Sequence, residues 1–598
     1  MNRGDILIVP ACEPARGGGH LCRCIALTVD LRASGQNAWL FLPEDTQTNS
    51  LFQSMDFNPA WRITSVNNER RAIGENIEFV VLDRFQTPAD ELLRWKKIAP
   101  VVGIDEGGAV RDSFDFLIDI LVPEKMGKPP ANIASASLLK FPPQPLNKRQ
   151  PGIFKVLVSF GQEDAAGLGT AVASSLSAMN DKRTMDITLL RGALASGEAE
   201  HLPNVRVMEA IPKLVERLGE YDLVITHYGI TAYEALYAGT AVLLASPTPY
   251  HTKLAKAAGF FELKMKKISF IILDSSFLIK LKKHCKALAA KYRLREGADL
   301  AALCGSFLPQ VNRSCPVCGA NAPDHSVCRF SERTYRRCLN CGVIFMDRSS
   351  PPPFEYGREY FFESYKKQYG KTYLEDFANI KEAGKRRLKV INSFLPAARK
   401  DGDAERTLLD IGCAYGPFLA AAREEGFSPE GIDPAQDAVR YVQQELALPA
   451  VQGFFPNSPP SPCSFDVVTL WFVIEHFTDC ARVLAEIKKT LKPGGILAFS
   501  TPSFSGVSGR SSLRRFLSAS PADHFTVWSP EMCKKALALA GFKVKKTVIC
   551  GHHPQRFPLL GKLAKSKKSP LYLPLLVISK IFGLGDTFEV YAAAHKKS

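Results

Sequence analysis

The sequence predicts an α/β protein of several domains, with three parallel-sheet domains and one small cysteine-rich segment. In three stretches, 1–140, 151–305 and 405–550, short β-branched runs alternate with helical patterns. Two Cys-x2-Cys pairs lie between the second and the third stretch. At roughly 100–200 residues per domain, the 598 residues allow about three to five such units.

The composition, with 46% hydrophobic and 23% charged residues, is typical of a globular protein and excludes a disordered, collagen-like or coiled-coil chain. The longest apolar runs, such as 571–579, are far shorter than the roughly 20 residues needed to cross a bilayer. The apolar run between Asp5 and Pro10 is too short for the core of a signal peptide. We therefore expect a cytoplasmic protein without a transmembrane segment, whose 15 cysteines are mostly free thiols.

The net charge of +16 is basic, but the excess of lysine and arginine is spread over several segments, including 261–297 and 551–598. A single basic stripe would instead be typical of a nucleic-acid binder. Such segments are most often solvated helix faces, and their functional alternatives are an anionic substrate, a membrane surface or RNA. We expect no DNA partner.

Proline-rich breaks at 140–152, 306–319 and 347–357 indicate the domain boundaries. Residues 311–346 are too few to build a hydrophobic core of their own. The predicted arrangement is a Rossmann-like domain at 1–145, a second at 150–308, a small ribbon at 311–346, a helical linker or acceptor region at 350–400, and a third Rossmann-like domain at 401–598.

The cysteine pairs of the ribbon are Cys315 with Cys318 and Cys338 with Cys341, and a glycine follows each pair. Each pair lets two thiolates meet on one ion, and the glycine permits a turn that aims backbone N–H groups at sulfur. Four thiolates fill a tetrahedral Zn²⁺ shell and leave no position for water. The sequence therefore predicts a structural zinc ion.

A nucleoside-cofactor site is predicted in the third Rossmann-like domain. Residues 405–427 predict a strand, a glycine turn and a helix, and Asp433 ends the next predicted strand. Gly412 and Gly416 allow the backbone to come close to a ligand, and an acid at the end of the second strand can accept hydrogen bonds from a ribose diol. Asp410 belongs to the same stretch and lies about 23 residues before Asp433.

Further motifs follow in a fixed order: 465–476 is predicted as the fourth strand, and LKPGG at 491–495 as a turn into the fifth. From LLDIGCAYG to 523–542, this series resembles the class I S-adenosylmethionine-dependent methyltransferases. The preceding cysteine ribbon resembles the front of a subset of these enzymes found in polysaccharide or modified-sugar pathways. The resemblance implies a methyltransferase fold and S-adenosylmethionine as cofactor.

By this resemblance, Asp410, Gly412 and Gly416 hold the methionine part of the cofactor and Asp433 holds its ribose. The family often has an acid near the adenine, but the corresponding stretch here is VQGFFPN. Adenine contact would therefore fall to Phe454 or Phe455 and to backbone groups.

A hydroxyl acceptor for the methyl group would also require a general base. His476, directly after the fourth predicted strand, is our candidate, and His524 is the alternative. Either histidine could instead simply pack or form a hydrogen bond within a loop.

The front half has two glycine turns that lead into helices. Gly18 and Gly19 follow the first strand and precede His20, which we expect at a domain cleft. A turn ahead of a helix suits an anionic or sugar ligand. In 222–244, Gly229 is followed by a helix that carries Glu234, a residue suited to the two ribose hydroxyls of a nucleotide.

These motifs resemble the two-Rossmann-domain (GT-B) glycosyltransferase group, and within it the nucleotide-sugar hydrolases of pseudaminic acid biosynthesis. The pattern G-H-x-x-R-C begins at Gly19, and S-F-G-x-x-D runs from Ser159 to Asp164. The resemblance implies that His20 is catalytic, and that the nucleotide sugar is bound by Gly18, Gly19, Arg23, Gly229 and Glu234. The family commonly has an aspartate just before the glycine loop, where this sequence offers only Glu13.

Three function hypotheses follow from the sequence. The first is a bifunctional enzyme that methylates a sugar or related small molecule and that hydrolyses or transfers a nucleotide sugar. The second is an RNA methyltransferase, for which RTYRRC at 333–338 is the local indication. The third joins a methyltransferase to a non-catalytic nucleotide-sugar-binding module. The tail at 571–598 is predicted to close the last domain, with peripheral membrane contact through its lysines as the alternative.

Overall fold

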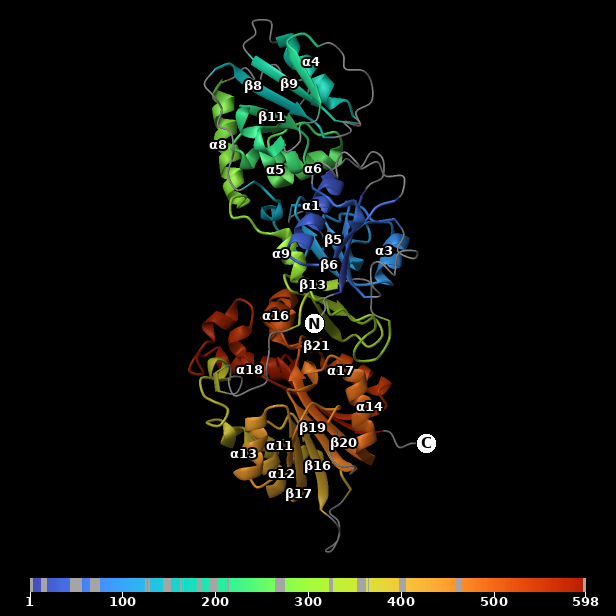
Figure 1. The fold of residues 1–598 in the computed structure, drawn as a ribbon. Helices are drawn as coiled ribbons and strands as arrows, with labels where there is room; N and C mark the ends of the chain where they lie inside the picture. Colours follow the sequence, from blue (N-terminus) through green and yellow to red (C-terminus); the bar gives the residue numbers. More distant parts are fainter. Residues whose placement is uncertain are drawn as a thin grey trace. The chain divides into compact units, whose positions relative to one another are not determined.

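The computed structural model describes residues 4–11, 19–43, 56–64, 76–123, 126, 129–142, 152–161, 164, 166–179, 185–192, 202–209, 211, 214–263, 275–321, 326–351, 362–363, 365–396, 405–458 and 464–594. The chain forms two compact units, which Figure 1 colours along the sequence. The first unit is 1–311 with 329–334 and 348–350, and the second is 312–328, 335–347 and 351–598.

The first unit contains a seven-stranded sheet in which every strand pair is parallel. Its order is β3 (Arg62–Ile63), β2 (Ala38–Phe41), β1 (Asp5–Pro10), β4 (Ile77–Asp83), β5 (Val101–Ile104), β6 (Phe116–Asp119) and β7 (Ile133–Ala134). The central strands are continuous apolar runs because both faces of the sheet are covered. The helices of this part are α1 (Gly19–Ala33), α3 (Ala89–Lys96) and α9 (Leu300–Gly305).

A second, five-stranded sheet of the same unit is also parallel throughout. Its order is β10 (Val205–Glu209), β9 (Met185–Arg191), β8 (Phe154–Ser159), β11 (Leu223–Thr226) and β12 (Ala241–Leu244). The accompanying helices are α4 (Leu168–Met179), α5 (Ile230–Tyr237), α6 (Pro249–Ala258) and α8 (Ser275–Lys291). One hydrophobic core contains side chains from both sheets, including Ile8 and Val224.

The second unit contains a mixed seven-stranded sheet. Its order is β18 (Ala450–Gln452), β17 (Phe427–Asp433), β16 (Arg406–Ile411), β19 (Phe465–Trp471), β20 (Leu491–Pro502), β23 (Thr587–Ala594) and β22 (Phe542–Cys550). Only β23 runs antiparallel to its neighbours, β20 and β22. This is the closing strand expected from the tail of the sequence.

Helices cover both faces of this sheet: Figure 1 shows α11, α12 and α13 to one side and α14 and α17 to the other. Their bounds are α11 (Phe377–Asn392), α12 (Pro417–Glu424), α13 (Gln436–Gln444), α14 (Cys480–Thr490) and α17 (Pro530–Leu539). Shorter helices are α10 (Tyr365–Tyr369), α15 (Val507–Ser511), α16 (Leu513–Ala519) and α18 (Tyr572–Ile581). The prediction of a fourth strand over 465–476 was too long, since β19 ends at Trp471 and 474–476 form one 3₁₀ turn.

The cysteine-rich segment forms a small sheet in the order β13 (Ser326–Phe330), β14 (Arg333–Arg337), β15 (Ile344–Arg348) and β21 (Thr526–Val527). Strand β21 comes from the far end of the chain and pairs antiparallel with β15. Cys315, Cys341 and the fully buried Trp528 belong to one hydrophobic core. The segment thus shares its core with the large sheet of the second unit. No described helix is long and apolar enough to cross a membrane.

Candidate functional site

The glycine turn after β16 is closed to any larger side chain. Gly412 has a φ of 74°, and a Cβ there would lie 2.5 Å from Cγ2 of Val473. Gly416 has a φ of 75° and precedes Pro417, the first residue of α12. A Cβ on Gly416 would lie 2.8 Å from Val442. Both positions therefore require glycine, on conformational as well as steric grounds.

Asp433 links the end of β17 to this turn. Its Oδ2 accepts a hydrogen bond from the backbone N–H of Ala414 at 2.8 Å, and Oδ1 accepts one from Ala435 at 2.9 Å. The side chain is buried, and burial raises the pKa of Asp433 to about 6. A carboxylate has about four acceptor sites, so these two bonds leave room for ribose hydroxyls.

Asp410 lies at the end of the neighbouring strand and is also buried. Thr469 of β19 donates a hydrogen bond from Oγ1 to Oδ1 of Asp410 at 2.6 Å. Burial raises the pKa of Asp410 to about 7, although this hydrogen bond acts to lower it. Two carboxyl groups with raised pKa values thus stand at the ends of adjacent parallel strands.

Aromatic residues surround the same turn, and our sequence analysis missed the most relevant one. Burial raises the pKa of Tyr373 well above its usual range, and the charges of Asp410 and Asp433 add to this effect. The ring of Tyr373 lies 6.2 Å from that of Tyr415. The only signal for Tyr373 was an aromatic-rich stretch ahead of a helix, which did not indicate what the tyrosine would approach.

The two phenylalanines proposed for the adenine have different surroundings. Phe454 follows β18 and is 60% exposed, whereas Phe455 is buried in the core of the domain. Of the two alternatives, Phe454 is therefore the one with an accessible ring.

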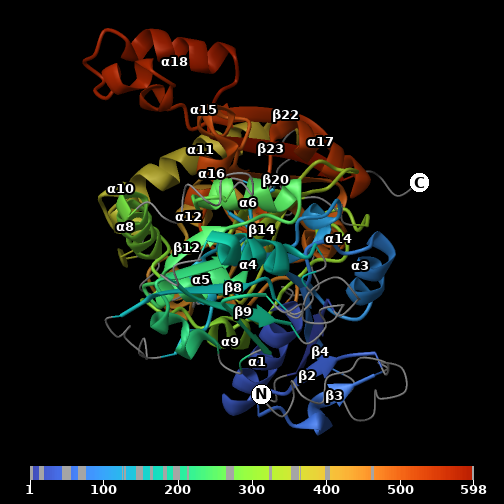
Figure 2. The same ribbon diagram turned by 90° about the horizontal axis from the view of Figure 1, so that it is seen from above.

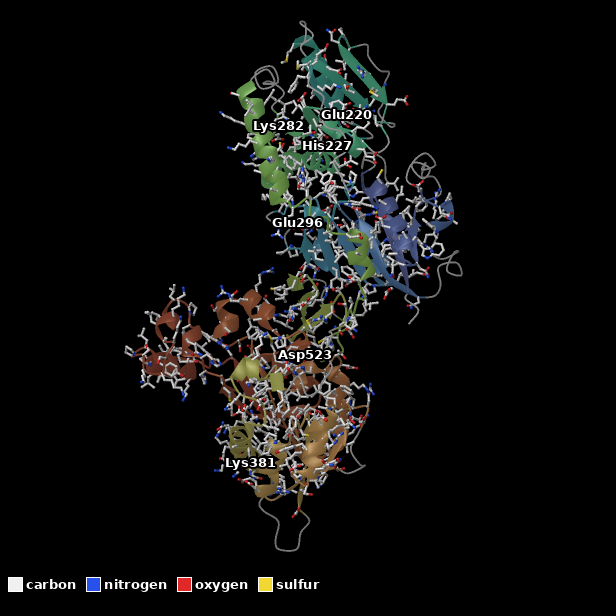
Figure 3. All side chains as sticks on the ribbon, turned by 60° about the vertical axis from the view of Figure 1, so that its left-hand side comes forward. Glu220, His227, Lys282, Glu296, Lys381 and Asp523 are labelled. Atoms are coloured by element: carbon white, nitrogen blue, oxygen red, sulfur yellow. The ribbon has the colours of Figure 1, made fainter. Side chains whose placement is uncertain are left out.

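A second polar cluster, which includes His476, is linked to the glycine turn through Val473. Val473, which abuts Gly412, is followed by the 3₁₀ turn that carries Glu475 and His476. The Nδ1 atom of His476 lies 3.0 Å from Oδ2 of Asp523, a residue labelled in Figure 3. The ring of His524 meets that of His476 edge-on, with centroids 4.7 Å apart.

His476 and Asp523 shift the pKa values of each other. Burial acts to lower the pKa of His476, but the hydrogen bond to Asp523 and the charge of Glu475 outweigh it and raise the pKa. Burial acts to raise the pKa of Asp523, yet His476 brings it down to about 2. The pair is therefore arranged to stabilise an imidazolium beside a carboxylate.

Our sequence analysis considered only the histidines His476 and His524 as general bases and therefore missed Glu475. It is 1% exposed, and neither carboxylate oxygen has a hydrogen-bond partner among the described residues. Burial raises the pKa of Glu475 to about 7. Glu475, His476 and His524 offer ligand atoms within 4.8 Å of one another, so they could also receive a cation. Asp523 already holds one ring nitrogen of His476.

The four predicted metal ligands come together. The sulfur atoms of Cys315, Cys318, Cys338 and Cys341 all lie within 4.8 Å of one another. The backbone N–H groups of Val317 and Cys341 point at the sulfurs of Cys315 and Cys338, each at 3.4 Å. Gly319 and Gly342 have φ values of 71° and 83°, as the predicted turns require. The donor set and its spacing fit a four-thiolate zinc shell. His325, which lies between the two cysteine pairs in the sequence, is outside the described residues.

In the first unit, His20 is the second residue of α1 and is buried rather than exposed on a loop. Its Nδ1 lies 2.6 Å from Oδ1 of Asp83, the last residue of β4. Arg23 donates to both oxygens of Asp83, at 2.7 and 2.6 Å, and to Asp105 at 2.7 Å. Burial would raise the pKa of Asp83, but Arg23 and His20 hold it well below its usual range.

Asp83 takes the place of the aspartate that the resembled family commonly has just before the glycine loop. We expected that acid just before the glycine loop, where Glu13 and also Gly18 lie outside the described residues. The structure brings an acid to His20 from the end of another parallel strand instead. The signal was Asp83 at the end of the apolar run 77–83, but the pairing spans 63 positions in the chain.

The second glycine turn of this unit lies beside the first. A Cβ on Gly19 would lie 3.8 Å from Cδ1 of Ile230, the first residue of α5. Gly229 caps α5, and burial raises the pKa of Glu234, on the same helix, to about 7. The charge of Glu234 also acts on Cys22 of α1. The starts of two helices from two parallel sheets thus face each other.

Two neighbouring residues have structural roles. Tyr228 precedes the Gly229 turn, and its hydroxyl donates to the carbonyl of Leu121 at 2.5 Å and lies 2.8 Å from that of Tyr233. The ring is therefore held in the interior. Asp164, of the S-F-G-x-x-D motif, accepts bonds from the N–H groups of Leu168 and Gly169 and caps α4.

Comparison with known proteins gives matches to part of the second unit. Residues 382–547 match a family model described as a methyltransferase domain. A ubiquinone biosynthesis O-methyltransferase of Albidiferax ferrireducens is 31% identical over 137 residues, which are 21% of this chain and 50% of that protein. The enzyme of the same name from Paracidovorax citrulli is 34% identical over 103 residues, or 16% and 43% of the two chains. The chain thus spans about half the length of the curated relatives that it matches.

Among solved structures, a SAM-dependent methyltransferase from Archaeoglobus fulgidus is 19% identical, with a TM-score of 0.28. The match covers 39% of this chain and 99% of that one. A second such enzyme, from Mesorhizobium loti, is 16% identical with a TM-score of 0.24, covering 34% and 96%.

Proposed function

We propose that this chain, whose second unit contains a class I S-adenosylmethionine-dependent methyltransferase domain, transfers a methyl group to a hydroxyl of a small-molecule acceptor. The observation that carries the proposal is the contact between Gly412 and Val473. Through this contact, the glycine turn 412–416, which is suited to the cofactor, lies next to the 3₁₀ turn that carries Glu475 and His476.

The residues present fit the cofactor. Gly412 is half-buried at the start of the glycine turn, where Asp433 would offer acceptors to the ribose and Asp410 would offer one to the ammonium group. Phe454 has an accessible ring for the adenine. When bound, S-adenosylmethionine supplies a methyl group that its positively charged sulfur activates toward displacement, so the protein mainly positions the acceptor and excludes water.

His476 is suited to take the proton of the acceptor. Its Nδ1 lies 3.0 Å from Oδ2 of Asp523, and we assign the proton-accepting role to Nε2. When Nε2 takes the proton, the ring becomes an imidazolium, which the carboxylates of Asp523 and Glu475 stabilise. Asp523 acts through His476 and is a positioning residue.

An oxygen acceptor agrees with the names of the curated relatives, which are O-methyltransferases. The acceptor class itself comes from the sequence resemblance to enzymes of sugar pathways, which favours a sugar or a related small molecule. The RNA alternative has less support. Arg336 of the RTYRRC segment is buried and paired with Asp347 at 2.7 Å, and Arg337 lies over the ring of Phe504. These arginines are therefore engaged within the second unit.

For the segment with four cysteines, we propose a structural zinc ion held by Cys315, Cys318, Cys338 and Cys341. Four thiolates leave no position for a substrate, so the ion would support the fold rather than the chemistry.

For the first unit, we propose a GT-B-type arrangement that binds a nucleotide sugar and hydrolyses or transfers it. Support comes from the facing helix starts at Gly19 and Gly229, and from the His20–Asp83 pair, which can hold a proton near such a ligand. A binding module without turnover is the alternative.

The test of methyl transfer uses the full chain, S-adenosylmethionine with a labelled methyl group, and a panel of catechols, free sugars and nucleotide sugars. We expect transfer to at least one hydroxyl-bearing acceptor, and its loss in His476→Ala. If labelled cofactor is bound but transferred at the same rate by wild type and His476→Ala, the proposed role of His476 is wrong.

A further inference from the structure

The chain between the last two strands of the large sheet forms a separate lobe, which we define as residues 551–586. It contains α18 and two 3₁₀ turns, at Pro554–Arg556 and Leu560–Leu563. Figure 2 shows α18 standing clear of β22 and β23, the strands that the lobe connects. The closing of the sheet by β23 does not by itself require such a long connection.

The lobe exposes an unusual amount of apolar side chain. Eight of the eighteen exposed large hydrophobic residues in the described part of the chain lie within it. They are Leu559 (90% exposed), Ile581 (71%), Phe582 (67%), Leu563 and Leu573 (65% each), Leu560 (49%), Val577 (45%) and Ile578 (40%). Single exposed apolar residues are ordinary, but a concentration of this kind marks an interaction surface.

Helix α18 is buried on one face and exposes apolar side chains on the opposite face. Leu575 and Ser579, one turn apart, are buried, and Ser579 forms a hydrogen bond with His552 of the same lobe. Leu573, Val577 and Ile581 follow the same four-residue spacing and are exposed. A helix that packs one face on its own domain normally carries polar residues on the opposite face. Apolar residues there indicate that this face binds a second apolar surface.

The charged residues of the lobe indicate which kind of surface the exposed apolar residues bind. Lys562, Lys565, Lys567, Lys568 and Lys580 are all exposed. The only acid of 551–586 is Asp586, which is buried and paired with Arg556 at 2.8 Å. Exposed leucines bordered by unopposed lysines match a bilayer with anionic headgroups, where apolar side chains enter the acyl boundary and lysines remain at the phosphates.

We infer that residues 551–586 dock the second unit on an anionic lipid surface. Helix α18 has ten residues, which is too few to cross a bilayer, so the lobe lies in the interface. The inference does not depend on the identity of the methyl acceptor or on the catalytic role of His476.

Flotation of the full chain with vesicles tests this proposal. We expect binding to vesicles of phosphatidylcholine with phosphatidylglycerol, weaker binding to phosphatidylcholine alone, and weakening by salt. The triple variant Lys565→Gln, Lys567→Gln, Lys568→Gln should bind the anionic vesicles about a hundredfold less, roughly fivefold for each charge removed. The apolar variant Leu573→Ser, Ile581→Ser should also lose binding.

Matched controls lie on α17 of the same unit. Leu539 is 53% exposed, and Lys534 and Lys535 are exposed as well. Leu539→Ser and Lys534→Gln, Lys535→Gln should bind vesicles like wild type. Unchanged cofactor affinity in the lobe variants would show that they are folded.

Three results would overturn the proposal. The first is the absence of binding to anionic vesicles, and the second is equal loss in the α17 controls. The third is a dimer in solution that Leu573→Ser, Ile581→Ser dissociates while vesicle binding is absent. That outcome would assign the surface to a second copy of the chain.

Discussion

The imidazole of His476 and the carboxylate of Asp523 lie 3.0 Å apart, although one follows β19 and the other precedes β21. Neither residue is near the other in sequence, and each is largely buried. The pair places a proton acceptor directly after Val473, the residue that contacts Gly412.

We expect Asp523→Asn to shift the pH dependence of methyl transfer. Asp523 contributes to the raised pKa of His476, so its neutral replacement lowers that pKa. A base acts in its neutral form, hence the rise of kcat/KM with pH should move to lower pH in the variant. His476→Ala should lower kcat by roughly 10²–10⁴-fold.

The control for this pair is His553→Ala, which changes a histidine outside the cluster and should leave the profile unchanged. A profile of Asp523→Asn that overlays wild type would show that His476 is not the titrating base. A chelator at a concentration that leaves the four-thiolate zinc in place distinguishes the metal alternative, because a proton acceptor then keeps its activity.

Cofactor binding should strengthen as the pH rises through about 6 to 7. Burial raises the pKa of Asp433 to about 6 and that of Asp410 to about 7, so both carboxyls are largely neutral at pH 5.5. Only the charged forms accept hydrogen bonds at full strength. Calorimetric titration of S-adenosylmethionine at pH 5.5 and pH 8 measures the difference.

Loss of Asp433 should weaken binding at pH 8 by about 1.5–3 kcal/mol, the range for a hydrogen bond to a charged group. Asp433→Asn keeps the shape of the side chain, and Glu445→Ala, an exposed position on the same domain, is the control. Equal affinity of Asp433→Asn and wild type would exclude Asp433 from the ribose site.

The purified chain should contain about one zinc ion for its four-thiolate site. Because the cysteines belong to the core of the second unit, Cys315→Ser should lower the melting temperature as well as the zinc content. Cys328→Ser, in the same small sheet but outside the cluster, should retain the metal. Protein purified without chelators that holds no zinc by elemental analysis would contradict this expectation.

For the first unit, His20→Ala should abolish release of nucleotide from UDP- or CMP-linked aminosugars. Nucleotide binding should stay within about tenfold of wild type, because a proton-transfer group acts mainly in the transition state. Glu234→Gln should show the opposite split, with weaker nucleotide binding. Full-length protein incubated with the panel provides both measurements, and binding without turnover in wild type would favour a binding module.

The sequence predicted those parts of the sites that local spacing determines. Gly412 and Asp433 belong to a strand–turn–helix–strand pattern whose geometry follows from the parallel sheet itself. The cysteine cluster was predicted for the same reason, since each Cys-x2-Cys pair is a local turn. Both required only short segments of the chain.

The partners of the two histidines could not be predicted in this way. Asp83 reaches His20 because β1 and β4 are neighbours in the sheet, although the chain visits β2 and β3 between them. Asp523 reaches His476 because β21, which follows Asp523, lies beside the 3₁₀ turn 474–476 and pairs with β15. Such contacts depend on sheet order, and a single sequence gives no information on it at these separations.

The pairing of β21 with β15 also determines where the methyltransferase domain can be cut. Phe525, two residues after Asp523, accepts a hydrogen bond from the N–H of Met346 at 2.9 Å. The family match begins only at residue 382 and therefore omits this partner strand. A fragment restricted to the matched region would retain the glycine turn but would lose the support that positions Asp523. We therefore expect that a fragment of the second unit keeps the His476–Asp523 pair in place only if it begins ahead of Cys315 and continues through β23.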